Sequence, residues 1–226
     1  VIRANGKIAI IDTGSGDTMG PTLGMLTKFL TEIDIDLPQV DTVLLTHMHP
    51  DHSNGLSDVN GKRLFPNAEI VVSEKDIDYW HDDSAMAKAN ENQRVRYFEG
   101  ARFQIAPYMD RLKPAMGEVF PNVRAVDLSG HTPGHTGYMI ESQNDSLLVW
   151  GDICHVPDIQ VRRPEVTMVF DADPEAAINT RRRTFDMVSS DKVLVAGMHL
   201  HFPGFSHVIA NRDGYRMVPE SWAFTT

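Results

Sequence analysis

A short run of metal-ligand side chains directly after a predicted strand constrains this chain more than any other feature. Residues 40–45 form an apolar stretch typical of a buried strand, and His47, His49, Asp51 and His52 follow within seven positions. His47 and His49 are alternate residues, so both imidazoles can point the same way on an extended backbone. Imidazole and carboxylate groups are ligands that zinc and similar divalent ions prefer. The run therefore predicts a metal site at the end of this strand.

Later segments offer further ligands for a site of two metals. His135 lies in a glycine-bearing loop, Asp152 follows a predicted strand at 147–150, and His199 follows another at 193–196. Strand ends and such loops combine a rigid scaffold with accessible space. Isolated histidines such as His81 and His207 are better explained as ordinary surface or core residues.

Composition excludes several classes of protein. The chain has 226 residues and a formal net charge of −10, which argues against a nucleic-acid partner because such binding depends on clustered Lys and Arg. No apolar run approaches the roughly 20 residues of a membrane span. The single cysteine, Cys154, excludes an internal disulfide framework, and we expect it to be a small buried residue.

The order of predicted elements favours an α+β fold with two sheets and helices outside them. We expect one domain over residues 1–226, because no Gly/Ser-rich or Pro-rich linker divides the chain. Since the chain starts within an Asn-Gly hairpin, we also expect a first strand to be missing upstream. Strands are predicted at 8–11, 40–45, 70–72, 123–128, 137–141, 147–150, 193–196, 208–210 and 215–218. Helices are predicted from Pro21 through Leu23, Leu26, Leu30 and Ile33, at 74–80, over most of 83–112, and at 173–189.

Together these motifs resemble the metallo-β-lactamase fold superfamily. The resemblance is carried by His-x-His-x-Asp-His at 47–52, Gly-His-Thr at 130–132, Gly-Asp at 151–152 and the late His199. Several stretches are most similar to methyl parathion hydrolases and related metallo-lactonases. These stretches are 20–24, 46–52, 65–68, 130–136, 199–204 and 214–219.

The resemblance implies an αββα sandwich with two mixed β-sheets, flanked by helices, and two metals at one edge. One metal would bind His47, His49 and His135, and the other Asp51, His52 and His199, with Asp152 bridging them. Asp12, His131 and His201 would support these ligands from behind. The expected cofactor is a pair of divalent ions, with zinc first and iron, cobalt or manganese as alternatives.

The implied activity is a zinc-dependent hydrolase of lactones or aryl esters that uses a hydroxide bridging the metals. Asp51 and Asp152 are the expected catalytic carboxylates, and Asp51 would move a proton toward the leaving group. Hydrolysis of organophosphate triesters is the alternative. A protein of another class, which binds metal without catalysis, would be expected to have lost ligands.

The predicted substrate pocket includes Trp80, Phe98 and His155. The two aromatic residues are equally well explained as helix core, and His155 stands where several homoserine-lactone lactonases have a tyrosine. We expect a small-molecule ester, lactone or phosphotriester as partner, no nucleic acid and no membrane. A homodimer is consistent with the resemblance. We expect a soluble protein, and its compartment, cytoplasmic or periplasmic, stays unknown because the true N-terminus is not visible.

Overall fold

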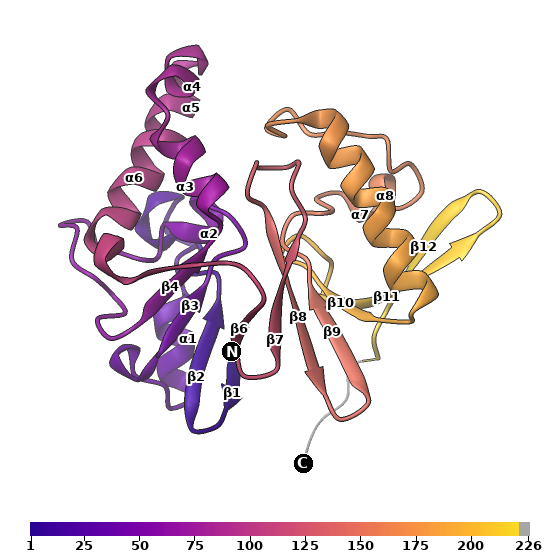
Figure 1. The fold of residues 1–226 in the computed structure, drawn as a ribbon, viewed down its shortest axis with the longest axis horizontal. Coiled ribbons are helices and arrows are strands. Elements are labelled where there is room, and N and C mark those ends of the chain that lie inside the picture. The colour runs from indigo at the N-terminus through magenta and orange to yellow at the C-terminus, as the bar shows by residue number, and fades with distance from the viewer. Residues whose placement is uncertain (222–226) are drawn as a thin grey trace. The chain divides into compact units, whose positions relative to one another are not determined.

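The computed structural model describes residues 1–221 and separates into two compact units, Val1–Pro121 and Asn122 onward (Figure 1). Each unit has its own sheet and its own cluster of buried apolar side chains. The single domain predicted for 1–226 and the strand expected upstream of it stay predictions. The last five residues of that range, 222–226, lie outside the described part.

The first unit is built on a mixed sheet with the strand order β1-β2-β3-β4-β5. A turn at Asn5 and Gly6, both with positive φ, joins β1 to β2 as an antiparallel hairpin. The following pairs are parallel, and all three residues of β3 are buried, as expected for a central parallel strand. The strands of this sheet are β1 (Ile2–Ala4), β2 (Lys7–Ile11), β3 (Thr42–Leu44), β4 (Glu69–Val72) and β5 (Leu112–Pro114). Strand β6 (Glu118–Phe120) follows in the chain and is not part of this sheet.

The helices of the first unit lie mostly between β4 and β5. As predicted, residues 83–112 are almost entirely helical, and they include a π-helix, η3. The helices are η1 (Gly16–Thr18), α1 (Leu26–Glu32), η2 (Leu37–Gln39), α2 (Pro50–Ser53), α3 (Glu74–His81), α4 (Asp83–Lys88), α5 (Glu91–Gln93), η3 (Arg94–Glu99), α6 (Gly100–Ile105) and η4 (Ala106–Arg111).

The predicted start of the first long helix at Pro21 is wrong, because α1 begins at Leu26. Gly24 has φ of +74°, and a Cβ at this position would lie 2.1 Å from the carbonyl oxygen of Gly16. This close approach holds the chain in a non-helical conformation. Of the predicted apolar face, Leu30 is buried, whereas Leu23 and Ile33 are about half exposed.

The second unit contains a mixed sheet in which β12, β11, β10, β9, β8 and β7 are neighbours in that order. The pair β9–β10 is parallel, and the other pairs within this unit are antiparallel. Helix α8 packs on β11 and is capped by the Asp173 side chain, which accepts from Ala176 N–H. The elements are β7 (Val123–Asp127), β8 (Thr136–Ser142), β9 (Asp145–Val149), α7 (Pro157–Gln160), α8 (Pro174–Ser190), β10 (Leu194–Ala196), β11 (Phe205–Asn211) and β12 (Gly214–Pro219).

Strand direction brings the predicted ligands together within each unit. In the first unit, parallel β2 and β3 end side by side, so Asp12 lies near the loop that begins at Thr46. In the second unit, the ends of parallel β9 and β10 lie next to the start of antiparallel β8. Loops that carry Asp152, His199 and His135 leave from that edge.

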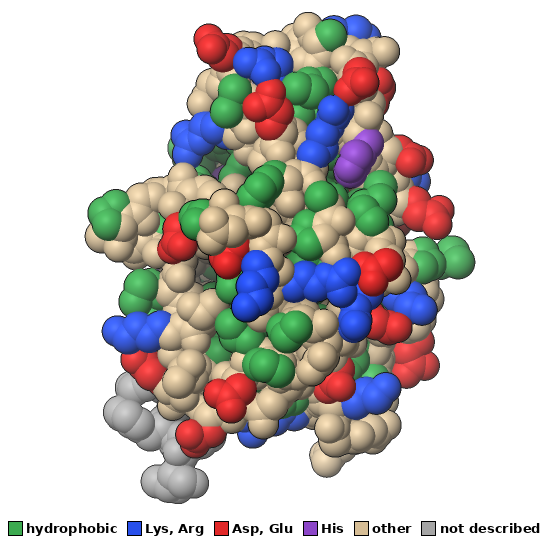
Figure 2. Space-filling view, turned by 90° about the vertical axis from the view of Figure 1, so that its left-hand side faces the viewer, with side chains coloured by type: hydrophobic (Ala, Val, Ile, Leu, Met, Phe, Trp, Pro, Cys, Tyr) green, Lys and Arg blue, Asp and Glu red, His purple; other side chains and the backbone are tan. Residues whose placement is uncertain are grey.

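The surface does not separate the charges by sign on the face drawn in Figure 2. Lys and Arg side chains lie among Asp and Glu side chains there. Among the described residues, no helix is both long and apolar enough to span a bilayer.

Candidate metal centre

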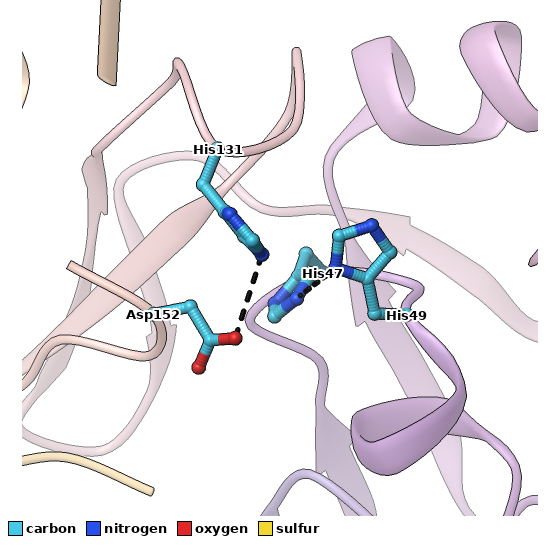
Figure 3. Close-up of side chains that lie close together, drawn as sticks. All are labelled: His47, His49, His131 and Asp152. Carbon is cyan, nitrogen blue, oxygen red and sulfur yellow. Dashed lines mark hydrogen bonds and ion pairs between the residues drawn. The ribbon is translucent and has the colours of Figure 1, made fainter. Parts of the chain in front are cut away.

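The first unit gathers four candidate ligands around the short helix α2. His49 occupies its N-cap and Pro50 its first turn, so the chain turns sharply between His49 and Asp51. The Nε2 of His47 lies 3.0 Å from the Nδ1 of His49 (Figure 3). His47, His49 and His52 are buried, whereas Asp51 is about one-third exposed.

Asp12 fixes the orientation of this group from behind. Its carboxylate accepts hydrogen bonds from the backbone N–H of Thr46 at 2.7 Å and from the Thr46 hydroxyl at 2.8 Å. It also lies 2.8 Å from Nδ1 of His52. If His52 carries its proton on Nδ1, the Nε2 lone pair is left for a metal, the arrangement common among metal-bound histidines. Burial raises the pKa of the Asp12 carboxyl, and the His52 imidazole and the Thr46 hydrogen bonds oppose that rise.

Asp76 is a supporting residue that the sequence did not reveal. It is fully buried in α3, and its carboxylate accepts from Met48 N–H at 3.0 Å and from Trp80 Nε1–H at 3.3 Å. Met48 lies between His47 and His49, so Asp76 pins the backbone of the ligand run. In the sequence it looks like an ordinary acidic residue in the first turn of a helix.

Aromatic side chains surround His49 within the first unit. The ring of Trp80 lies 5.4 Å from the His49 ring, and that of Tyr97 lies 5.1 Å from it. Phe98 is buried against Trp80, so the helix-core interpretation fits it best. Tyr97 was missed because the sequence does not disclose that η3 is a π-helix, whose altered spacing changes which side chains share a face.

In the second unit, the Asp152 carboxylate is the centre of a group of histidines. Its Oδ2 lies 3.0 Å from Nε2 of His155, 3.3 Å from Nε2 of His199 and 3.4 Å from Nε2 of His131. Asp152, His131 and His155 have buried side chains, and His199 is about one-third exposed. Asp152 is therefore placed to bind a metal together with any of these histidines.

His131 and His135 differ in a way that bears on the predicted ligand set. His131 Nδ1 lies 2.8 Å from the Asp171 carboxylate, while its Nε2 faces Asp152 (Figure 3). His135 instead has Nδ1 3.0 Å from the carbonyl of Leu128, and its Nε2 accepts the Asp152 N–H at 3.0 Å. A metal-binding histidine uses one ring nitrogen for the ion and donates from the other to a carboxylate, a backbone carbonyl or water, but in His135 both ring nitrogens already bond to the backbone. The geometry therefore favours His131 over His135, contrary to our expectation.

The remaining predicted residues occupy two different environments. His155 stacks on the His199 ring at 4.9 Å and contacts the ring of Phe170. His201 is exposed and lies 3.1 Å from Asp158 on α7. It is thus a surface residue of the second unit, and Asp158, rather than Asp152, is its ion-pair partner.

A buried arginine on α8 holds the backbone around Asp152. Arg181 donates to the carbonyls of Ile153, Pro164 and Val166 at 2.7–2.9 Å. Gln160 donates to the same Val166 carbonyl and accepts from His155 N–H. These bonds tie the Asp152 loop to the segment that leads to Asp171.

The donor set fits divalent metal ions. In the first unit, ligand atoms of His47 and His49 lie within 4.8 Å of one another, as do those of Asp51 and His52. In the second unit, Asp152 offers an oxygen within that distance of His131 and of His199. Imidazole nitrogens and carboxylate oxygens, several of them buried and supported by carboxylates, are suited to zinc and to other first-row metals.

The chain belongs to the metallo-beta-lactamase superfamily, whose family model matches residues 1–199. This confirms the resemblance, and with the two mixed sheets flanked by helices it confirms the predicted α+β fold class. The N-acyl homoserine lactonase of Bacillus thuringiensis is 24% identical over 180 residues, which cover 79% of this chain. The aligned region spans 60% of that relative's length.

Two solved structures are similar over almost the whole chain. The hydrolase AbOPH of the beta lactamase superfamily is 32% identical, with a TM-score of 0.89, over 97% of this chain and 78% of its own. AidC, a dizinc quorum-quenching lactonase solved with the product N-hexnoyl-L-homoserine, is 25% identical with a TM-score of 0.90. That match covers 98% of this chain and 78% of AidC.

Proposed function

We propose that this protein is a binuclear, zinc-dependent hydrolase that cleaves lactones or aryl esters. The observation that carries the proposal is the ligand run of the first unit, in which Asp12 orients His52 beside His47 and His49. The similarity of the chain to lactonases supports the substrate class. The activity of the whole protein is part of the proposal, since the chain matches 60% of the lactonase's length.

We infer that the ligand groups of the two units bind the same pair of ions. The first unit supplies His47, His49, Asp51 and His52, which is too few for two ions with several protein ligands each. We assign His131, Asp152 and His199 of the second unit to complete the set. His131 replaces the expected His135 because Asp171 supports its ring and its Nε2 faces Asp152.

Two bound divalent ions would polarise the substrate carbonyl and lower the pKa of water enough to supply a nucleophile near neutral pH. Asp51 is the carboxylate best placed to carry a proton toward the leaving group, because its side chain is partly exposed while its neighbours are buried. Tyr97 adds a hydroxyl that stays protonated, since burial and the nearby Asp51 carboxylate raise its pKa. We assign this hydroxyl a role in binding a substrate oxygen.

The test is a metal analysis joined to a substrate panel. The purified protein is expected to hold close to two metals per chain and to hydrolyse a γ-lactone and an aryl acetate. His49→Ala should abolish hydrolysis and lower the metal content, whereas His81→Ala should change neither because His81 is exposed and bonded to Ile77 on its own helix. Full activity of His49→Ala or of the metal-free protein would refute the proposal.

The same panel decides between the alternatives. Turnover of methyl paraoxon alone would indicate a phosphotriesterase, and two bound metals without any turnover would indicate a non-catalytic metal-binding protein. His131→Ala and His135→Ala separate the two candidate ligands. We expect His131→Ala to lose about one metal per chain and His135→Ala to retain both. If only His135→Ala loses metal, His135 rather than His131 is the ligand.

A further inference from the structure

A cavity of about 360 Å³ lies in the first unit, and none of the predicted metal ligands lines it. It is bounded by η1, by the end of α2 and by the junction of η3 with α6, and its lining includes Asn54, Gly100 and Phe103. We propose that this cavity binds a small neutral ligand with a short alkyl chain and one N–H or O–H donor, such as an aliphatic amide or alcohol. The inference does not depend on the proposed metal chemistry.

Asn54 supplies the polar end of the site. Its side chain is about 95% buried, and Nδ2 donates to the Thr18 hydroxyl at 2.9 Å. That hydroxyl donates its own hydrogen to the carbonyl of Ser15 at 2.8 Å, so it can only accept from Asn54. This network assigns which end of the Asn54 amide is Nδ2, a choice that the shape of the side chain alone leaves open.

The fixed orientation leaves Asn54 Oδ1 buried with no hydrogen-bond partner among the described residues. A buried acceptor without a donor is costly, so in native proteins such a group is paired with a protein atom, an ordered water or a ligand. The missing partner must be a donor, because Oδ1 can only accept. This requirement excludes ligands that carry acceptors alone, such as esters and ethers.

Gly100 provides room beside the Asn54 amide. A Cβ at Gly100 would lie 3.9 Å from both Oδ1 and Nδ2 of Asn54. The residue starts α6 within a continuous helical stretch and has no positive φ, so its backbone does not require glycine. Because alanine is the better helix former, the absence of a side chain here is best explained by space for a ligand.

Apolar side chains and the local charge define the rest of the ligand. Val59, Val95 and Phe103 line the cavity, and they are 74%, 44% and 45% exposed. The acidic groups of the lining are Asp17, which is exposed, and Glu99, which Arg94 pairs with. Because the lining contains these carboxylates and its nearby Arg94 is already paired, the cavity disfavours a fatty-acid carboxylate. The neutral amide deep in the cavity favours a neutral donor over an ammonium group.

The experiment titrates the metal-loaded protein with hexanamide and follows side-chain amide signals by 15N NMR. Hexanamide should bind and shift the Asn54 signal, whereas N,N-dimethylhexanamide, which lacks a donor, and hexanoate, which is an anion, should bind at least about tenfold more weakly. Equal binding of hexanamide and N,N-dimethylhexanamide, or no binding of hexanamide, would overturn the proposal.

Two variants test the cavity itself. Gly100→Ala fills the space beside Oδ1 and should weaken hexanamide binding about tenfold or more without lowering the melting temperature. Phe103→Ala should weaken it through loss of the apolar wall, and Met109→Ala serves as the control because Met109 is similarly exposed but does not line the cavity. Unchanged affinity in both cavity variants would place hexanamide elsewhere on the protein and refute the site.

Discussion

At the scale of single residues, Asp12 is the carboxylate of the first unit that positions the predicted ligand His52 and the start of its loop. It holds the Thr46 backbone, the Thr46 hydroxyl and the His52 ring at once. Its φ of +57° is a conformation that Asp and Asn tolerate better than most residues. Asn is therefore the substitution that removes the charge while keeping the backbone.

We expect Asp12→Asn to weaken metal affinity by roughly 10- to 100-fold. The asparagine amide would place N–H groups against Nδ1–H of His52 and so favour the wrong tautomer. Competition with a chromogenic chelator measures the affinity, and circular dichroism checks the fold. Asp78→Asn, at an exposed position of α3, is the control. Equal affinity of Asp12→Asn and the parent protein would show that Asp12 does not orient the ligand.

Cys154 illustrates how burial decides reactivity. The thiol is fully buried, and burial raises its pKa to about 12. Since the thiolate is the reactive form, we expect iodoacetamide at pH 8 to leave the native protein unmodified and to label it fully after denaturation. Mass spectrometry of the intact chain measures the label. Rapid labelling of the folded protein would contradict this prediction.

The sequence revealed residues whose chemistry and local spacing identify them, and it missed those that act through tertiary contacts. The metal motif from His47 to His52 could be recognised because its ligands are near one another in the chain. Asp76 and Tyr97 were not, because only folding brings α3 and η3 against the His49 loop. The choice between His131 and His135 depends on Asp171, about forty residues away.

At the scale of elements, α8 combines an exposed outer face with one buried cation. Arg181 is 1% exposed, and burial lowers its pKa. Its three carbonyl acceptors belong to the Asp152 loop and to the segment at 164–166. The helix therefore acts as the support on which that loop is fixed.

We expect Arg181→Met to lower the free energy of unfolding by about 3 kcal/mol, since buried carbonyls lose their donor. Arg182→Met is the matched control on the same helix, because its ion pair with Glu165 is exposed and 4.0 Å long and should contribute at most about 0.5 kcal/mol. Urea unfolding followed by fluorescence gives both values. Similar losses in the two variants would show that the buried bonds do not stabilise the loop.

Elements were predictable where local pattern and local energy agree. Short β-branched runs gave most strands to within two residues, and Asp173 with Pro174 marked the start of α8. The start of α1 was not predictable, because the contact of Gly24 with Gly16 is tertiary. The π-helix η3 likewise has no sequence signature that separates it from an α-helix.

At the scale of the whole molecule, each unit has its own buried core and its own share of the predicted ligands. The family could be recognised from the sequence because the metal motifs recur at the ends of predicted strands. The division into two units could not, since no linker composition marks the boundary near Pro121. The proposed assignment gives both units ligands to the same ions, so it predicts that metal binding couples their folding.

Metal removal tests that link directly. A ligand that binds only the folded state stabilises it by about 4 kcal/mol when its concentration is 1,000 times Kd. We expect the metal-loaded protein to unfold in one cooperative transition, and the chelated protein to melt at a lower temperature in two. Calorimetry with and without chelator measures this, and adding zinc back should restore the single transition. His47→Ala should behave like the chelated protein even with metal present. An identical single transition in all samples would show that the ions do not couple the two units.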